Sequence, residues 1–108
     1  MKLGNTQAQM RKGILELCIL SILSKDSKYS SEILQTLKNS KLIVVEGTIY
    51  PLLTRLKNST LLEYNWKESK NGPPRKYYTI TEEGKSFLKN LNHSWLELSD
   101  AVTKIRNT

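Results

Sequence analysis

Hydrophobic residues recur at helical spacing in four stretches of the chain and alternate with polar residues in two shorter ones. The first helical stretch runs from about residue 7 to residue 24 and is apolar around much of its girth, which predicts a helix with more than one neighbour. Thr6 and Gln9, three residues apart, are typical of a capping box at its start. The polar stretch 25–28 is expected to end it.

Two shorter helices are predicted next. The first is capped by Ser30 or Ser31 and extends to about Asn39. Its inward positions are Ile33, Leu34 and Leu37. The next helix has one apolar face, formed by Ile49, Leu52, Leu53 and Leu56. Because Pro51 lacks a backbone N–H and is tolerated only in the first turn, that helix is expected to begin at Gly47 or Thr48.

The alternating stretches predict an antiparallel hairpin. Apolar side chains occupy every second position at Leu62, Tyr64 and Trp66, and again at Tyr78 and Ile80. Between them Asn71-Gly72 is a strong turn signal, and Pro73 and Pro74 are expected to stiffen the loop. Trp66 is expected to join the core.

The last helix is predicted from about residue 82 to residue 106, with Thr81 as its cap. Its length would be roughly 37 Å, longer than a domain of this size is wide. Its apolar residues repeat at spacings of three and four, which predicts pairing with another helix and therefore a homodimer. A helix that folds back on its own domain would show the same pattern. The positions expected at the dimer interface are Leu88, Leu91, Trp95, Leu98, Val102 and Ile105.

The excess of positive charge lies in the part of the chain before this helix. The 17 Lys and Arg exceed the 10 Asp and Glu by a net charge of +7. Residues 1–80 carry the whole excess, whereas residues 81–108 balance. We therefore expect contacts with a polyanion, nucleic acid first, in residues 1–80 and a different task for the last helix.

Three helices, a hairpin and a long terminal helix predict a mainly α fold with a small antiparallel β-hairpin, which is a winged helix-turn-helix with a dimerisation helix. In 108 residues we expect one compact unit, with residues 1–81 binding DNA and residues 82–108 forming the dimer. Arg55 could read guanine or bind phosphate. The full set of expected DNA-binding residues is Ser30, Ser31, Thr48, Tyr50, Pro51, Thr54, Arg55, Lys67, Lys70, Arg75 and Lys76.

Enzyme chemistry has no support in the sequence. The lone His93 is expected on a solvated helix face and the lone Cys18 in the core, and neither paired carboxylates nor metal-ligand spacing is present. We expect no metal and no cofactor. The N-terminus lacks the features of a signal peptide and no apolar run is long enough to span a membrane, so a cytoplasmic protein without membrane contact is expected.

Three motifs resemble the PadR-like transcriptional regulators, in the smaller subclass with a single C-terminal helix. They are the stretches at residues 11–17, 47–56 and 74–84, which resemble the family's first helix, recognition helix and wing with the following helix start. The resemblance covers about residues 8–106 and implies a homodimeric repressor, often controlled by a phenolic or hydrophobic small molecule. Where the family usually has glycine this chain has Thr60, and Asn58 is expected to supply the left-handed turn.

The resemblance also implies an effector site. In similar drug-binding proteins a tryptophan of the last helix stacks planar ligands across the dimer, and Trp95 occupies the corresponding position here. Met10, Gly13, Glu16 and Leu17 would line the same space, where Glu16 would favour a cation. The alternative is that Trp95 only packs the dimer core.

A second class of function is a protein-interaction module. A winged helix could use its apolar seam to bind a different protein and no longer bind DNA. The uneven distribution of charge favours DNA binding, because the excess of +7 would otherwise have no explanation.

Overall fold

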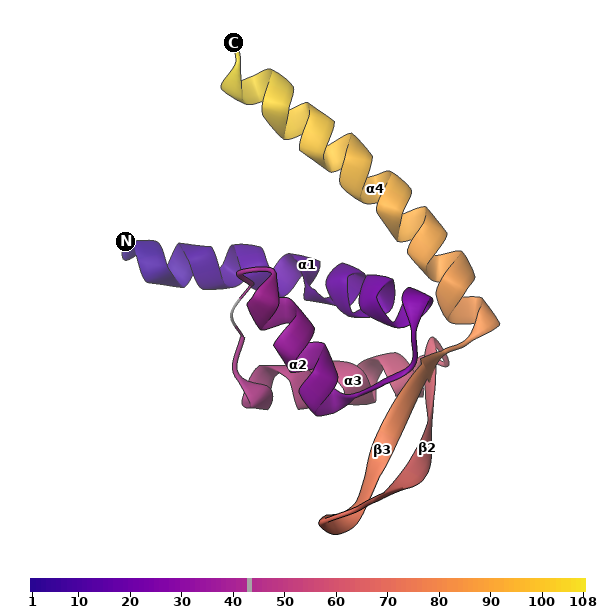
Figure 1. Ribbon diagram of the computed structural model, residues 1–108. Coiled ribbons are helices and arrows are strands. Elements are labelled where there is room, and N and C mark those ends of the chain that lie inside the picture. Colours follow the sequence, from indigo (N-terminus) through magenta and orange to yellow (C-terminus); the bar gives the residue numbers. More distant parts are fainter. Residues whose placement is uncertain (43) are drawn as a thin grey trace.

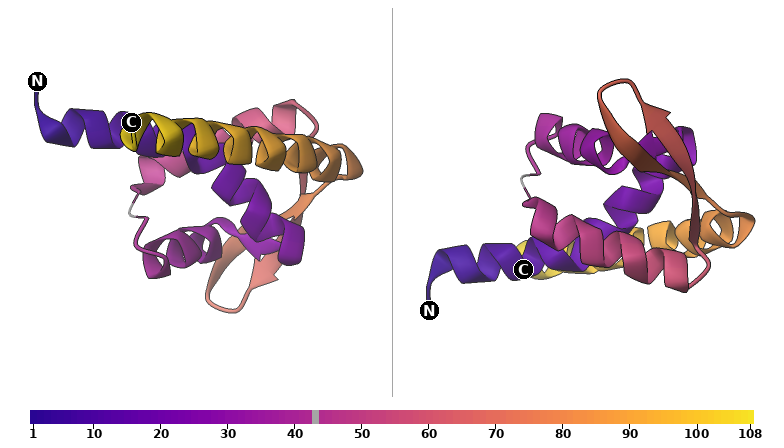
Figure 2. Two further views of the ribbon diagram at one scale, coloured as in Figure 1. Left: turned by 90° about the horizontal axis from the view of Figure 1, so that it is seen from above. Right: turned by 90° about the horizontal axis from the view of Figure 1, so that it is seen from below.

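The computed structural model describes residues 1–42 and 44–108 and consists of four helices and a three-stranded sheet (Figure 1). The helices are α1 (Leu3–Lys25), α2 (Ser30–Asn39), α3 (Glu46–Asn58) and α4 (Glu82–Arg106), and the strands are β1 (Lys28–Tyr29), β2 (Leu62–Ser69) and β3 (Gly72–Ile80). α2 and α3 lie on one side of α1 and α4 lies on the other (Figures 1 and 2). The predicted fold class is confirmed.

The predicted start of α1 is wrong. The helix begins at Leu3, with Lys2 as its N-cap and no side-chain cap, so Thr6 and Gln9 lie inside the helix and form no capping box. A capping box is useful only where backbone N–H groups lack carbonyl partners, and here the helix extends one turn further. The predicted end, one residue before Lys25, agrees with the structure within the usual precision of helix ends.

The start of α2 also differs from the prediction. Tyr29 is the N-cap, while Ser30 and Ser31 already lie in the helix. The backbone N–H of Tyr29 donates to Glu32 Oε1 at 2.9 Å, so a carboxylate three residues into the helix stabilises this end. Its end at Asn39 and its inward face are confirmed.

Helix α3 begins one residue before the predicted range, at Glu46, and Pro51 lies inside the helix beyond its first turn. The expectation that proline must occupy the first turn is therefore wrong. Pro51 is exposed, so the carbonyl group that lacks its usual N–H partner lies on the solvent side of the helix. The apolar face is confirmed, since Ile49, Leu53 and Leu56 are buried.

The sheet has the strand order β1-β3-β2, with both pairs antiparallel. The hairpin is confirmed, but β3 begins at Gly72, so Pro73 and Pro74 belong to a strand and not to the loop. They lie beside a register shift between Lys67 and Ser69, where missing N–H donors disturb the ladder least. The two-residue strand β1 was not predicted.

The turn between α3 and β2 corrects a further expectation. Thr60 itself adopts the left-handed conformation, with φ of 64°, whereas Asn58 is the last residue of α3. The Thr60 hydroxyl donates to the Glu83 carboxylate, and its backbone carbonyl accepts from Thr81 Oγ1 at 2.7 Å. These bonds tie the turn to the start of α4.

The predicted cap of α4 is confirmed, because Thr81 Oγ1 accepts from the backbone N–H of Gly84 at 2.9 Å. Gly84 looks unfavourable in a helix, but the packing requires it. A Cβ atom there would lie 2.2 Å from the Leu61 carbonyl oxygen and 2.7 Å from Ile80 Cγ1. Gly84 thus lets α4 start directly against the end of the sheet.

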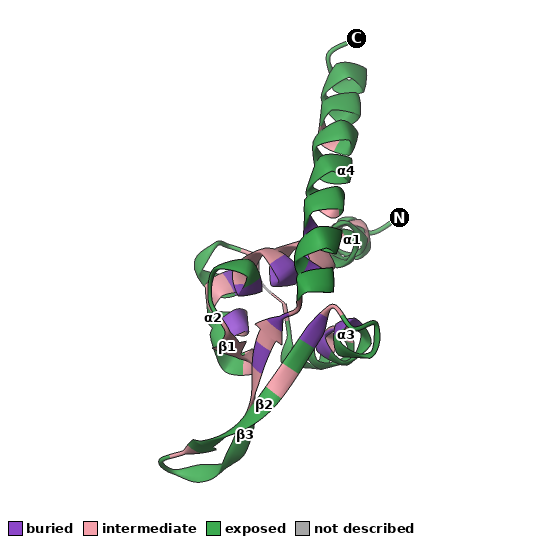
Figure 3. Ribbon diagram, turned by 90° about the vertical axis from the view of Figure 1, so that its right-hand side faces the viewer, coloured by how far each residue is buried: buried purple, intermediate pink, exposed green. Residues whose placement is uncertain are grey.

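One core lies between α1, α2, α3, the sheet and the first turns of α4. Trp66 is 62% exposed on the hairpin, so its predicted place in the core is wrong. The hairpin extends beyond the helices that cover its base (Figure 3), so part of β2, which carries Trp66, has no helix to pack against. The buried residues are Leu15, Ile19, Leu20, Leu23, Ile33, Leu37, Ile49, Leu53, Leu56, Leu62, Tyr78, Ile80 and Leu88.

Helix α4 starts beside the C-terminal end of α1 and then diverges from the domain (Figure 1). Leu88 is buried and Leu91 is half-buried, but the later apolar residues are exposed (Figure 3). Trp95 is 41% exposed, Leu98 59%, Val102 45% and Ile105 72%. The rest of the chain therefore covers only the beginning of the apolar seam of α4, which runs from Leu88 to Ile105. From Trp95 onward the helix does not fold back on its own domain.

Candidate nucleic-acid interface

The outward face of α3 follows from the burial of its other side. Because Ile49, Leu53 and Leu56 fix one face in the core, the positions between them point to solvent. Tyr50, Pro51, Thr54 and Arg55 are exposed, and Thr48 is half-buried. An open hollow on this face is lined by Tyr50, Pro51, Thr54, Arg55, Asn58 and Ser59.

Arg55 does not simply point to solvent. Its guanidinium forms an ion pair with the carboxylate of Glu16 on α1. The Arg55 side chain remains 67% exposed, whereas that of Glu16 is 23% exposed. The structure thus brings an expected DNA-binding residue together with an expected effector-binding residue, which the sequence analysis did not foresee.

The expected wing cations rest on aromatic rings. Lys67 Nζ lies 3.9 Å from the centroid of the Tyr77 ring, and the Arg75 guanidinium lies 4.6 Å from that of Tyr29. The rings of Tyr29 and Tyr77 meet edge to face at 5.0 Å. Strand β1 therefore supports the wing, because it brings Tyr29 against β3 and beneath Arg75.

The charges of the wing are not neutralised by carboxylates in the described part of the chain. Ion pairs among residues 1–42 and 44–108 join Arg55 to Glu16, and three more lie along α4, between residues 82 and 104. One of these pairs places His93 beside Glu97 on the exposed side of α4, as expected for a solvated histidine. Lys67, Lys70, Arg75 and Lys76 thus remain available to a polyanion.

Ser30 and Ser31 lie at the start of α2, where Ser30 is half-buried and Ser31 is exposed. Ser31 lines a hollow that also includes Glu46 at the start of α3. Ser31 therefore flanks the N-terminal end of α3.

The expected effector residues lie on α1 and α4. Met10 is 70% exposed, and a Cβ atom at Gly13 would meet no other atom within 4 Å. Leu17 is half-buried, like Glu16. The space beside Gly13 is therefore open in a single chain.

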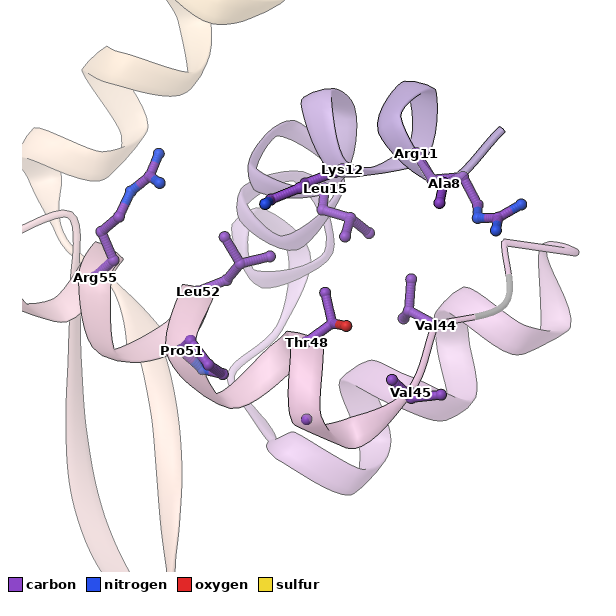
Figure 4. Close-up of a pocket in the computed structure, with 11 residues that line it drawn as sticks. Ala8, Arg11, Lys12, Leu15, Val44, Val45, Thr48, Pro51, Leu52 and Arg55 are labelled. Atoms are coloured by element: carbon purple, nitrogen blue, oxygen red, sulfur yellow. The ribbon is translucent and has the colours of Figure 1, made fainter. Parts of the chain in front are cut away.

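A hollow that the sequence analysis missed lies on another side of α1, between this helix and α3 (Figure 4). Its volume is about 620 Å³, and its apolar floor includes Leu15 and Leu52. Arg11, Lys12 and Arg55 provide cationic edges. No sequence signal marks it, because it depends on how α1 and α3 pack.

Two groups have raised pKa values because they are removed from water. Burial raises the pKa of the Cys18 thiol, so this half-buried cysteine is protonated at neutral pH and is a poor nucleophile. Burial, followed by the nearby phenols of Tyr64 and Tyr50, raises the pKa of Tyr78 in the sheet. Both groups act as packing elements.

Two negative findings concern the described residues. No helix among them is long and apolar enough to cross a membrane. In residues 1–42 and 44–108, His, Cys, Asp and Glu side chains do not gather in groups of three or more that could hold a metal ion.

Together, the fold and this surface define a winged helix-turn-helix DNA-binding protein. Residues 19–90 match the model of the transcriptional regulator PadR-like family. The chain belongs to this family, whose members are transcriptional regulators.

Solved structures and a sequence relative agree with this assignment. A PadR-like transcription factor from Bacteroides fragilis is 58% identical, with a TM-score of 0.79 over 94% of this chain and 98% of the other. A PadR family transcriptional regulator from Eggerthella lenta is 30% identical, with a TM-score of 0.90 over 98% and 93%. An uncharacterised protein of Lysinibacillus sphaericus is 30% identical over 94 residues, which are 84% of this chain and 86% of that protein.

Proposed function

We propose that the chain is a cytoplasmic repressor that binds duplex DNA as a homodimer. One observation carries the DNA-binding part of this proposal. Helix α3 and the hairpin both lie on the side of α1 away from α4 (Figure 1), and exposed α3 residues such as Thr54 line one hollow together with Lys76 of the hairpin. A helix in the major groove and a cationic hairpin on the neighbouring backbone would use these two surfaces together.

In this proposal the residues of α3 read the DNA and those of the wing hold it. Thr48, Thr54 and Arg55 would meet base edges, with Tyr50 and Pro51 packed beside them. Ser30 and Ser31 would contact the backbone near the start of α3. Lys67, Lys70, Arg75 and Lys76 would bind phosphates.

Dimerisation through α4 is proposed from the exposed seam. Trp95, Leu98, Val102 and Ile105 leave a contiguous apolar face in water, and exposed apolar patches of this kind mark interaction surfaces. Charge on this helix is balanced, so repulsion between two copies is small. Residues 1–81 would then bind DNA and residues 82–108 would join the two copies, with Leu88 and Leu91 at the base of the seam.

Repression is proposed because of the size of the dimer. A small dimer that covers a promoter excludes other proteins from the same DNA. An effector would reverse this only by binding one dimer conformation better than the other. We propose that Trp95 stacks a planar aromatic or hydrophobic effector, with Met10, Gly13, Glu16 and Leu17 beside it.

The effector proposal is tested by titrating planar aromatic cations and phenolic compounds while tryptophan fluorescence is followed. The chain has two tryptophans, so the Trp66→Phe variant leaves Trp95 as the source of the signal. Because Trp66 is 62% exposed, this replacement should not disturb the core. Quenching that accompanies a loss of DNA affinity supports the proposal. Quenching without any change in DNA affinity, or no quenching across a broad panel, contradicts it.

A protein-interaction module is the second candidate, favoured by the same exposed seam on α4. Salt dependence separates the two candidates. The affinity for a duplex selected from a random pool should fall steeply as salt rises, because each phosphate contact releases about one counterion. If no duplex from the pool binds more tightly than random DNA and salt has no effect, the interaction module becomes the better account.

A further inference from the structure

A small hollow lies at the corner where the last turns of α3 meet the sheet. Its volume is about 160 Å³. It is separate from the hollow between α1 and α3, and it joins the expected DNA-binding residues Thr54 and Lys76 to Lys57 and Tyr64, which were not expected to bind DNA. The lining residues are Thr54, Lys57 and Asn58 from α3 and Tyr64, Lys76 and Tyr78 from β2 and β3.

Two ammonium groups from different elements approach one aromatic ring at this corner. Lys57 Nζ lies 5.9 Å from the centroid of the Tyr64 ring, and Lys76 Nζ lies 4.6 Å from it. Lys76 Nζ is also 5.6 Å from the Trp66 ring, which meets Tyr64 edge to face. The aromatic rings attract both cations and restrict where their charges can lie.

No carboxylate balances these two charges. Neither Lys57 nor Lys76 takes part in an ion pair within residues 1–42 and 44–108, and no Asp or Glu lines the hollow. The neighbouring acid on β2, Glu63, is adjacent to Tyr64 in the strand, and successive side chains point to opposite faces of a sheet. Two like charges held near one ring repel each other, and an anion bound between them would offset this repulsion.

The remaining lining groups suit an oxyanion. The Thr54 hydroxyl and the Asn58 side-chain amide are one helical turn apart on the exposed face of α3 and can donate hydrogen bonds. The hollow exceeds the volume that one water molecule occupies in the liquid, about 30 Å³. Thr54 and Asn58 also belong to the exposed face of α3, which would enter the major groove.

We propose that this hollow is the seat of one backbone phosphate of duplex DNA, held by Lys57 and Lys76. Tyr64 positions both ammonium groups, and Thr54 and Asn58 donate the neutral hydrogen bonds. The inference rests on the proposed DNA binding and adds Lys57 and Tyr64 to it. A phosphate held between α3 and the hairpin would fix the angle between the helix in the groove and the wing on the backbone.

The test uses the full chain and a duplex selected from a random pool. Each phosphate in turn is replaced by an uncharged methylphosphonate, and the dissociation constant is measured for the wild type and for Lys57→Gln. Lys89→Gln is the matched control, because Lys89 is also exposed but lies on α4. Thermal unfolding of each variant checks that the fold is unchanged.

In the wild type and in Lys89→Gln, neutralising one particular phosphate in a half-site should weaken binding on the order of tenfold, the usual size of a charged hydrogen bond. In Lys57→Gln the same replacement should cost clearly less than in the wild type, because only Lys76 is left to bind that phosphate. The slope of log K against log salt should also become shallower, by about 0.9 for each phosphate that the protein no longer neutralises.

Three results would overturn the inference. If every replacement costs the same in the wild type and in Lys57→Gln, DNA binding stands but the phosphate seat does not exist. If inorganic phosphate perturbs the Lys57 side-chain resonances while no replacement distinguishes the two proteins, the hollow takes a free oxyanion and not DNA. If the wild type binds no selected duplex, the proposed function fails, and the phosphate seat fails with it.

Discussion

Arg55 on α3 forms an ion pair with Glu16 on α1, so the helix proposed to read DNA is tied to the helix proposed to line the effector site. The pair is exposed on the arginine side, where solvent weakens it. To contact DNA, Arg55 must exchange the Glu16 carboxylate for a base edge or a phosphate. The two proposed sites are therefore linked by one exchangeable contact.

Glu16→Gln should strengthen DNA binding, because Arg55 would no longer be held by a carboxylate. Exposed ion pairs contribute about 0–1 kcal/mol, so the gain should reach at most about fivefold. The double variant Glu16→Gln with Arg55→Ala is the control and should bind no better than Arg55→Ala alone. An equal gain in both backgrounds would show that Glu16 acts through overall charge and not through Arg55.

Arg55→Ala and Lys70→Ala should differ in how their effect on binding depends on the DNA sequence. If Arg55 reads a base, its loss should cost about 1–3 kcal/mol on the selected duplex and less on random DNA. Loss of Lys70, at the exposed tip of the hairpin, should weaken binding to both duplexes alike and reduce the salt dependence. Equal losses on both duplexes for Arg55→Ala would make Arg55 a phosphate contact.

Leu98→Glu should separate the dimer. Leu98 is 59% exposed in the single chain, so the variant should fold, but a charge inside an apolar helix interface costs several kcal/mol. Sedimentation at micromolar concentration should show dimers for the wild type and monomers for the variant. Lys89→Glu changes charge on the same helix outside the seam and should remain dimeric. A monomeric wild type would remove the basis of the claim.

Gly84→Ala should destabilise the fold by several kcal/mol. The added Cβ would lie 2.2 Å from a backbone oxygen, which cannot move aside as a flexible side chain would. Gly13→Ala is the matched control within a helix. Because its Cβ meets nothing within 4 Å, it should raise the unfolding free energy by about 1 kcal/mol through helix propensity. Chemical denaturation of both variants measures the contrast, and a tolerated Gly84→Ala would refute the close packing of α4 on Leu61.

Thr60→Gly should stabilise the turn before β2. A left-handed conformation costs a non-glycine residue roughly 1–2 kcal/mol, and the exposed hydroxyl contact with Glu83 returns less than that. We therefore expect a net gain of about 1 kcal/mol in the unfolding free energy. Thr60→Ser, which keeps both the hydroxyl and the left-handed strain, should change little. A loss of stability in Thr60→Gly would mean that the hydroxyl contact outweighs the backbone strain.

The sequence predicted the features that depend on local pattern. Thr81 with two following glutamates marks a helix start, and the spacing of apolar residues marks the helix itself, so α4 and its cap appear where expected. The hairpin follows from alternation around Asn71-Gly72. These signals lie within a few residues of the structure that they specify.

Features that depend on distant contacts were missed. Strand β1 has only two residues and exists because Lys28 and Tyr29 pair with Tyr78 and Tyr77, far along the chain. Alternation identified Trp66 as a strand residue but could not show that the hairpin extends past the core at that point. The pairing of Arg55 with Glu16 likewise requires the packing of α3 on α1, which no local pattern encodes.

Hydroxyl-radical footprinting on the selected duplex tests the central claim most directly. If two copies joined through α4 place two α3 helices on DNA, the protected sites should be related by two-fold symmetry and lie roughly one helical turn apart, or a multiple of that spacing. Leu98→Glu should lose this paired protection at the same protein concentration. A single protected patch without two-fold character, unchanged in Leu98→Glu, would contradict the account.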